Sequence, residues 1–150
     1  ARTLRRRPFR VTCDRAFRQV ITECATIERR GSWISDEFID AYCALHEAGD
    51  AHSVECWCGD QLVGGIYGVA AGGLFAGESM FHRESDASKV ALKHLIDHLK
   101  ARGFRLFDIQ MLTPITRQLG AIEISRAGYL ERLNMAVELN VEFGPSVEFE

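Results

Sequence analysis

The chain of 150 residues has only three prolines, no long apolar run and an odd number of cysteines. No apolar stretch approaches the roughly 20 residues that a membrane-spanning helix needs, so we expect no membrane partner. Five scattered cysteines do not form the even set of a disulfide framework and indicate reduced thiols. The start of the chain is too basic, and too short of a hydrophobic core, for a signal peptide. These features together predict a cytoplasmic protein.

The charge of the chain is small overall but uneven along its length. A formal net charge of −3 argues against binding a polyanion through bulk charge. The first ten residues nevertheless hold five arginines and no acid, which is a local anion-attracting patch or simply a solvated segment. We expect one domain over residues 1–150, with a basic N-terminal segment (1–10) and a loosely held acidic tail (141–150).

The apolar pattern predicts alternating strands and helices. Period-2 alternation indicates strands, and helical spacing bounded by capping residues and glycines indicates helices. Asp14, Ser35 and Ser125 stand where helix N-caps are expected. We expect strands over 9–13, 51–58, 62–71, 74–81 and 104–111, and helices over 14–28, 36–48, 87–102, 114–119 and 125–137. This order predicts an α/β fold whose mixed sheet contains an antiparallel meander and one crossover through the helix 87–102.

The most informative stretch is 62–81, LVGGIYGVAAGGLFAGESMF, which reads as a hairpin turning at Gly72 and Gly73. Its many glycines weaken a strand, and glycine inside a strand often marks a bulge or the close approach of a ligand or backbone. Glu78 lies inside this otherwise apolar run. Because a buried carboxylate without partners is costly, Glu78 either has specific partners or acts on a substrate.

Other candidate residues have a structural alternative that remains open from spacing alone. Asp108 and Gln110 share one face of a strand, and a satisfied polar pair is the more common case for such spacing. Trp33 is either a core residue or a stacking surface for a base. Neither Cys56 with Cys58 nor His94 with His98 has the further ligands that a zinc site needs, so we expect no metal.

Several stretches resemble one family in order along nearly the whole chain. They include FRVTCDRAFRQVITECA, SWI, AYCALHEAGDAHSVECW, FAGESMF, SDASKVALKHLI, FDIQ and LGAIEISRAGYL. They are similar to the bacterial leucyl/phenylalanyl-tRNA–protein transferases. The resemblance implies transfer of Leu or Phe, and in some members Met, from aminoacyl-tRNA to the N-terminal amine of proteins that begin with Lys or Arg. The product is marked for N-end-rule degradation, and the fold implied is that of the acyl-CoA N-acyltransferases (GNAT-like).

The resemblance also implies roles for individual residues. The catalytic set comprises Glu78, Asp108 and Gln110. The apolar pocket for the transferred side chain comprises Ile66, Phe75, Met80, Leu95, Leu99 and Phe107. Contacts with tRNA fall on Trp33, which stacks on adenine, and on Arg2, Arg5 and Arg6. The resemblance implies no cofactor, because the tRNA ester is already activated. The chain is expected to be a short form or a fragment, and it has Ile115 where members often carry a His.

Two other functions stay open at this stage. An acetyl-CoA-type N-acyltransferase would need a pyrophosphate loop, and the run at 117–122, RQLGAI, fails that pattern at its last position. A non-catalytic binder of basic N-termini or of tRNA would bind without forming product. A transfer assay with aminoacyl-tRNA separates aminoacyl transfer from both of these functions.

Overall fold

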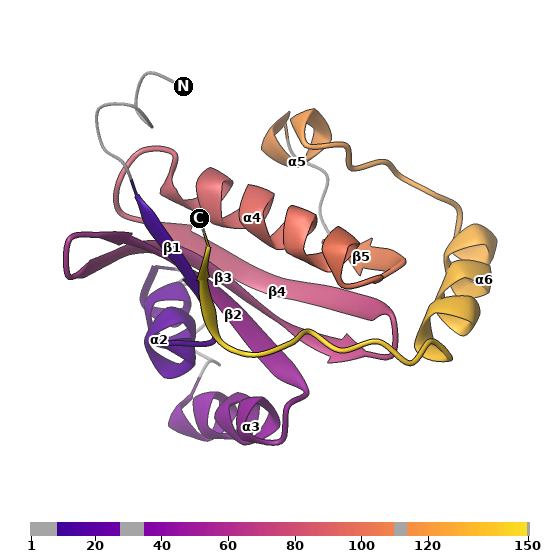
Figure 1. Ribbon diagram of the computed structural model, residues 1–150, viewed down its shortest axis with the longest axis horizontal. Helices are drawn as coiled ribbons and strands as arrows, with labels where there is room; N and C mark the ends of the chain where they lie inside the picture. Colours follow the sequence, from indigo (N-terminus) through magenta and orange to yellow (C-terminus); the bar gives the residue numbers. More distant parts are fainter. Residues whose placement is uncertain (1–8, 28–34, 110–113, 150) are drawn as a thin grey trace.

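The computed structural model describes residues 9–27, 35–109 and 114–149 of the chain. Six strands form one sheet in the order β5-β4-β3-β2-β1-β6 (Figure 1). The strands are β1 (Arg10–Cys13), β2 (Ala51–Cys58), β3 (Gln61–Ala71), β4 (Leu74–His82), β5 (Leu106–Asp108) and β6 (Val147–Phe149). The helices are α2 (Phe17–Ile27), α3 (Asp36–Glu47), α4 (Ala87–Ala101), α5 (Pro114–Gln118) and α6 (Arg126–Val137). None of these described helices has the length and apolar character to cross a bilayer.

The topology follows the sequence-based expectation closely. β2, β3 and β4 form the predicted antiparallel meander. The chain then crosses over through α4, and β5 pairs with β4 in parallel, as the strand–helix–strand order predicts. The predicted mixed α/β sheet is therefore confirmed.

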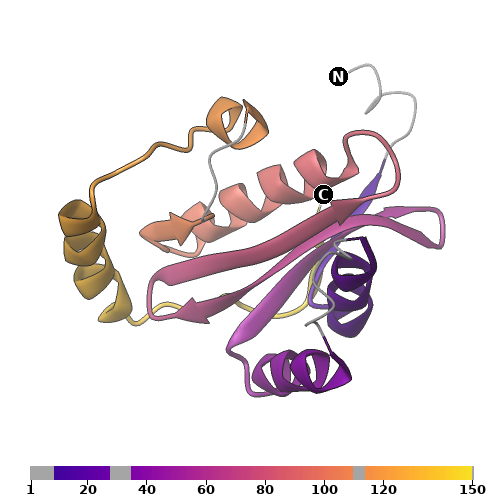
Figure 2. The ribbon, with the colours of Figure 1, turned by 180° about the vertical axis from the view of Figure 1, so that it is seen from behind.

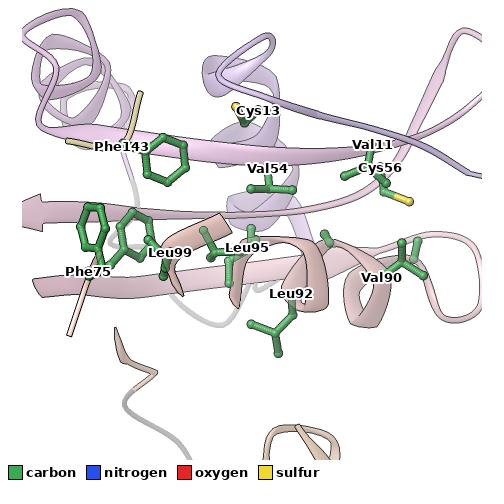
Figure 3. Close-up of a cluster of buried hydrophobic side chains, with 14 of the residues drawn as sticks. Val11, Cys13, Val54, Cys56, Phe75, Val90, Leu92, Leu95, Leu99 and Phe143 are labelled. Carbon is green, nitrogen blue, oxygen red and sulfur yellow. The ribbon is translucent and has the colours of Figure 1, made fainter. Parts of the chain in front are cut away.

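The helices cover the sheet on two sides. α4 lies over one face, and α2 and α3 lie over the other, as the two opposite views show (Figures 1 and 2). Each interface has its own apolar cluster. The cluster under α4 contains Val54, Phe75, Leu95 and Leu99 (Figure 3). The cluster under α2 and α3 contains Val20, Ile21, Tyr67 and Phe81.

The helix caps agree with the sequence at two of the three predicted positions. The hydroxyl oxygens of Ser35 and Ser125 accept hydrogen bonds from backbone N–H groups in the first turns of α3 and α6. The prediction for Asp14 was wrong, because α2 begins only at Phe17. The Asp14 carboxylate instead accepts the backbone N–H of Ser53 and pairs with the His52 ring across the sheet. This long-range contact takes the oxygens that a helix cap would use.

The C-terminal tail is also ordered differently from the expectation. Val147–Phe149 forms β6, which pairs antiparallel with β1. The prediction of a loosely held tail over 141–150 was therefore wrong for the paired residues 147–149. Phe143 is buried and stacks on the His52 ring at a centroid distance of 4.1 Å. Apolar side chains at 143, 147 and 149 pack in or against the cluster under α4. In Figure 1 the tail runs from α6 back to β1.

Candidate active site at the β4 bulge

Glu78 is an extra residue in β4. Gly77 and Ser79 pair with the consecutive residues Gly68 and Tyr67 of β3, so the strand bulges at Glu78. A bulge bends its strand and re-aims side chains, and bulges are frequent beside active sites. The glycine-rich sequence had indicated a bulge or a close approach of backbone, and both are found, because a Cβ added at Gly68 would lie 2.3 Å from the backbone oxygen of Ala76.

The bulge explains how β4 serves both cores. Phe75 and Phe81 are six residues apart, so in an unbroken strand they would lie on one face. Phe75 instead packs in the cluster under α4, whereas Phe81 packs under α2 and α3. One inserted residue is what reverses the alternation, and the conformation at Glu78 is therefore tied to the burial of Phe81.

Glu78 has a partner from α3. Its exposed carboxylate lies close enough to Tyr42 to act on the pKa of that phenol. Burial, together with the charge and hydrogen bond of Glu78, raises the pKa of Tyr42 above its ordinary value. The Tyr42 ring packs edge-on against Tyr67 at a centroid distance of 5.7 Å, which fixes the phenol beside the bulge. Glu78 therefore faces the α2 and α3 side of the sheet.

Asp108 has a similar partner from α6. The Tyr129 hydroxyl donates a hydrogen bond of 2.9 Å to Asp108 Oδ2, and this bond raises the pKa of the phenol. Phe107 points toward Phe75 under α4, with ring centroids 5.8 Å apart, so Asp108 points to the opposite side of the sheet. Both candidate carboxylates therefore face the α2 and α3 side of the sheet, and each lies beside a tyrosine.

The two acids lie on neighbouring strands. Asp108 pairs with Ala76, which precedes Glu78 by two residues in β4. A rise of roughly 3.3 Å per residue and a strand spacing of about 4.8 Å place their Cα atoms about 8 Å apart. Gln110, the third member of the predicted catalytic set, lies outside the described residues, as do Trp33, Arg2, Arg5 and Arg6.

The six residues of the predicted apolar pocket form part of one packed cluster. Ile66, Phe75, Leu95 and Leu99 are buried within the core. Met80 and Phe107 are partly buried at its margin. A hollow of about 230 Å³ adjoins this margin at Phe107, between α4, Ile109 and Leu119. Four members thus occupy core positions, and the assignment of all six as a side-chain pocket stays a prediction.

A larger cavity of about 660 Å³ lies along β5. Its walls are β5, the segment 120–124 and the first turns of α6, and they include Asp108 and Tyr129. The volume is in the range of small-molecule sites, roughly 300–1,000 Å³.

Sequence reasoning missed both tyrosines and a buried carboxylate. Nothing in the local pattern of Tyr42 or Tyr129 indicates that they reach acids on β4 and β5, because both contacts join distant elements. Glu55 is fully buried in β2, where Thr12 Oγ1 donates to it at 2.6 Å and the backbone N–H of Arg15 at 3.2 Å. Burial raises the pKa of Glu55. The alternation of 51–58 predicted a strand but not this carboxylate in its core.

The cysteines behave as packing residues. Burial raises the pKa of Cys13 to about 11 and that of Cys56 to about 12, so both thiols stay protonated at neutral pH. Within the described ranges, no three His, Cys, Asp or Glu side chains are placed to share a metal ion.

Two solved acetyltransferase structures align with this fold. A ribosomal-protein-alanine N-acetyltransferase from Brucella melitensis biovar Abortus 2308 aligns with a TM-score of 0.54 at 15% identity, over 78% of this chain and 94% of that one. An aminoglycoside acetyltransferase from an uncultured soil metagenomic sample aligns with a TM-score of 0.54 at 12% identity, over 95% and 94% of the two chains. At such identities the likeness shows the fold alone, and it confirms the predicted GNAT-like class.

Relatives found by sequence are much more similar to this chain than these structures are. The family model "Leucyl/phenylalanyl-tRNA protein transferase" matches residues 1–134. Curated proteins named leucyl/phenylalanyl-tRNA–protein transferase include one from Rhizorhabdus wittichii, 52% identical over 139 residues, which cover 91% of this chain and 56% of that protein. Another, from Ruegeria pomeroyi, is 47% identical over 148 residues, which cover 99% of this chain and 70% of that protein. The chain thus spans little more than half the length of the first relative, and it belongs to the leucyl/phenylalanyl-tRNA protein transferase family.

Proposed function

We propose that the chain transfers Leu or Phe, and in some cases Met, from aminoacyl-tRNA to the N-terminal amine of proteins that begin with Lys or Arg. The transfer marks its protein substrates for N-end-rule degradation in the cytoplasm. The observation that carries the proposal is the family match together with the two acids that the β4 bulge and β5 bring to one face.

The reaction is aminolysis of an ester. The amine nitrogen attacks the ester carbonyl, a C–N bond forms, and the C–O bond to the terminal ribose breaks. One proton leaves the amine and one ends on the ribose oxygen, which yields a peptide amide and free tRNA. Because the ester is already activated, this chemistry needs no nucleotide or metal.

The acids have a defined task in this scheme. An α-amine has a pKa of about 7.7–8.0, so much of it reaches the site as an ammonium ion. Glu78 and Asp108 attract that ammonium and the basic side chain beside it, and they hold the amine against the ester. Tyr129 fixes the Asp108 carboxylate through its hydrogen bond, and Tyr42 lies beside Glu78. Gln110 holds the amine or receives its proton, and positioning supplies much of the rate.

Selection of the transferred residue falls to the apolar margin at Met80 and Phe107. The hollow of about 230 Å³ beside Phe107 is smaller than a typical drug-sized site, which suits a single side chain. An apolar pocket selects Leu and Phe over polar side chains but discriminates only modestly between similar apolar ones. This fits acceptance of both Leu and Phe.

The test is a transfer assay with Leu-tRNA and a peptide that begins with Arg. We expect labelled product from the wild-type chain and none with a peptide that begins with Ala. Glu78→Ala and Asp108→Ala should each abolish transfer while circular dichroism shows that the fold is retained. Asp97→Ala is the matched control, because Asp97 is an exposed carboxylate on α4 that pairs with Lys93. Wild-type rates in both site variants would overturn the assignment.

The acetyltransferase fold favours one alternative, N-acylation from acetyl-CoA. Tight acetyl-CoA binding with acetylated product, and no product from Leu-tRNA, would support it. Binding of tRNA or of the Arg peptide with no product from either donor would support a non-catalytic adaptor.

A further inference from the structure

The turn between β3 and β4 has two glycines, and the C-terminal end of α6 rests on it (Figure 1). Gly72 has a φ of +56°, a conformation that glycine adopts easily and that other residues rarely adopt. A Cβ added at Gly72 would also lie 2.3 Å from the carbonyl oxygen of Val137, which is backbone at the end of α6. The missing side chain at Gly72 therefore makes room for a second backbone as well as for the turn.

Gly73 is hydrogen-bonded to both elements that carry the acid–tyrosine pair, β5 and α6. Its N–H donates a hydrogen bond of 2.6 Å to the carbonyl oxygen of Ala136 in α6. Its own carbonyl oxygen accepts from the backbone N–H groups of Arg105 and Leu106, at 2.9 and 3.2 Å, where β5 begins. This two-residue turn therefore ties the end of α6 to the start of β5.

The rest of α6 is weakly held. Of its twelve residues, all of which the structure describes, Ala136 alone is buried. Leu130 and Met135 are 43% and 68% exposed, and the cavity along β5 adjoins the first half of the helix. Tyr129 lies in that half, about 10 Å along the helix from Ala136 at a rise of about 1.5 Å per residue. The position of the Tyr129 hydroxyl therefore depends on how the other end of α6 is held.

We infer that the Gly72–Gly73 turn is a seat that positions the Tyr129 hydroxyl on Asp108, which makes Gly72 a positioning residue for the proposed transfer. The inference rests on the proposed function for its effect on rate, whereas its effect on the Tyr129–Asp108 hydrogen bond rests on the contacts alone. Close-packed groups transmit strain instead of absorbing it. A shift of about 1 Å at the seat would carry the 2.9 Å bond past the limit of about 3.2 Å for a good hydrogen bond.

The main variant is Gly72→Ala, whose Cβ would push the Val137 backbone away from the turn by roughly 1 Å. Gly59→Ala is the matched control. Gly59 is the glycine of the β2–β3 turn, with a φ of +62° and no described atom within 4 Å of an added Cβ. Alanine there brings the same backbone strain without displacing another element. Leu139→Ala is a second seat variant, which leaves the hairpin intact and removes the side chain that lies over Gly73.

The first measurement is the titration of Tyr129, which needs no substrate. The hydrogen bond to Asp108 raises the pKa of the Tyr129 phenol above its ordinary value. The chain has three tyrosines, so NMR with labelled tyrosine follows each phenol, and the signal lost in Tyr129→Phe identifies Tyr129. We expect the pKa of Tyr129 to fall toward its ordinary value in Gly72→Ala and Leu139→Ala, and to stay unchanged in Gly59→Ala.

An unchanged pKa of Tyr129 in both seat variants would overturn the inference, and so would an equal fall in the control. If circular dichroism shows that Gly72→Ala has not folded, Leu139→Ala decides the question alone.

The second measurement is kcat/KM for transfer of Leu to a peptide that begins with Arg. We expect Gly72→Ala to lower it about 5- to 10-fold, as Tyr129→Phe should, because each removes one hydrogen bond to Asp108. Gly72→Ala should cause no further loss in the Tyr129→Phe background, and losses that multiply would overturn the inference. Transfer by the wild-type chain, with the pKa of Tyr129 unchanged in the seat variants, refutes the seat alone. A lowered pKa of Tyr129 in the seat variants, with no product from the wild-type chain, refutes the proposed function and leaves the seat standing.

Discussion

Deleting Glu78 tests the claim that one inserted residue reverses the faces of β4. Without the extra residue, alternation would carry the side chain of Phe81 from the α2 and α3 side to the α4 side. Phe81 is 2% exposed and belongs to the cluster with Phe17 and Val20, so its displacement empties a core position. Loss of a buried Phe costs about 3–5 kcal/mol, which is a large part of the roughly 5–15 kcal/mol that stabilises a domain.

The matched variant is Glu78→Ala, which keeps the chain length and the bulge. Because the Glu78 carboxylate is exposed, this substitution should cost less than about 1 kcal/mol. Urea unfolding followed by circular dichroism at 25 °C measures both variants. We expect the deletion to lower the free energy of unfolding by at least 3 kcal/mol more than Glu78→Ala does. Similar stabilities for the two variants would refute the link between the bulge and the burial of Phe81.

Three further predictions concern single contacts. Tyr129→Phe should lower kcat/KM for transfer about 5- to 10-fold, because it removes a hydrogen bond worth about 1–1.4 kcal/mol to Asp108; an unchanged kcat/KM would exclude a positioning role. Gly68→Ala should lower the free energy of unfolding in urea by more than about 3 kcal/mol, because its Cβ would lie 2.3 Å from the backbone oxygen of Ala76. Gly77→Ala should cost much less, because its Cβ would lie 3.2 Å from the Phe107 ring, which can move. Equal costs would contradict this packing. Burial raises the pKa of Glu55 above its value in the unfolded chain, so the contribution of Glu55 to stability falls as pH rises from the unfolded pKa to the folded pKa. The urea midpoint of Glu55→Gln should therefore rise relative to that of the wild type between about pH 4.5 and 7. A difference in midpoint that stays constant over this range would contradict the prediction.

The elements that local sequence specifies were predicted well. The hairpin at Gly72 and Gly73, the meander and the crossover through α4 each follow from period, turn residues and caps. The glycines were interpreted as marking a bulge or a close approach of backbone, and the strand holds both. Local pattern is sufficient for these features because each depends on residues that are close in sequence.

The features that the sequence did not predict depend on distant contacts. Asp14 looks like a helix cap, but its carboxylate is bound by Ser53 and His52 from β2. The order of the tail depends on pairing with β1, which lies more than 130 residues earlier. Tyr129 reaches Asp108 only because α6 packs beside β5. No window of local sequence contains both partners of any of these contacts.

The central claim is that Glu78 and Asp108 hold the same incoming amine from neighbouring strands. The most direct measurement is a double-mutant cycle in the single-turnover rate of Leu transfer to a peptide that begins with Arg, with Glu78→Gln, Asp108→Asn and the double variant. We predict large losses in both single variants and a coupling of at least about 1 kcal/mol between them. Wild-type rates in the single variants, or losses that simply add, would contradict the claim.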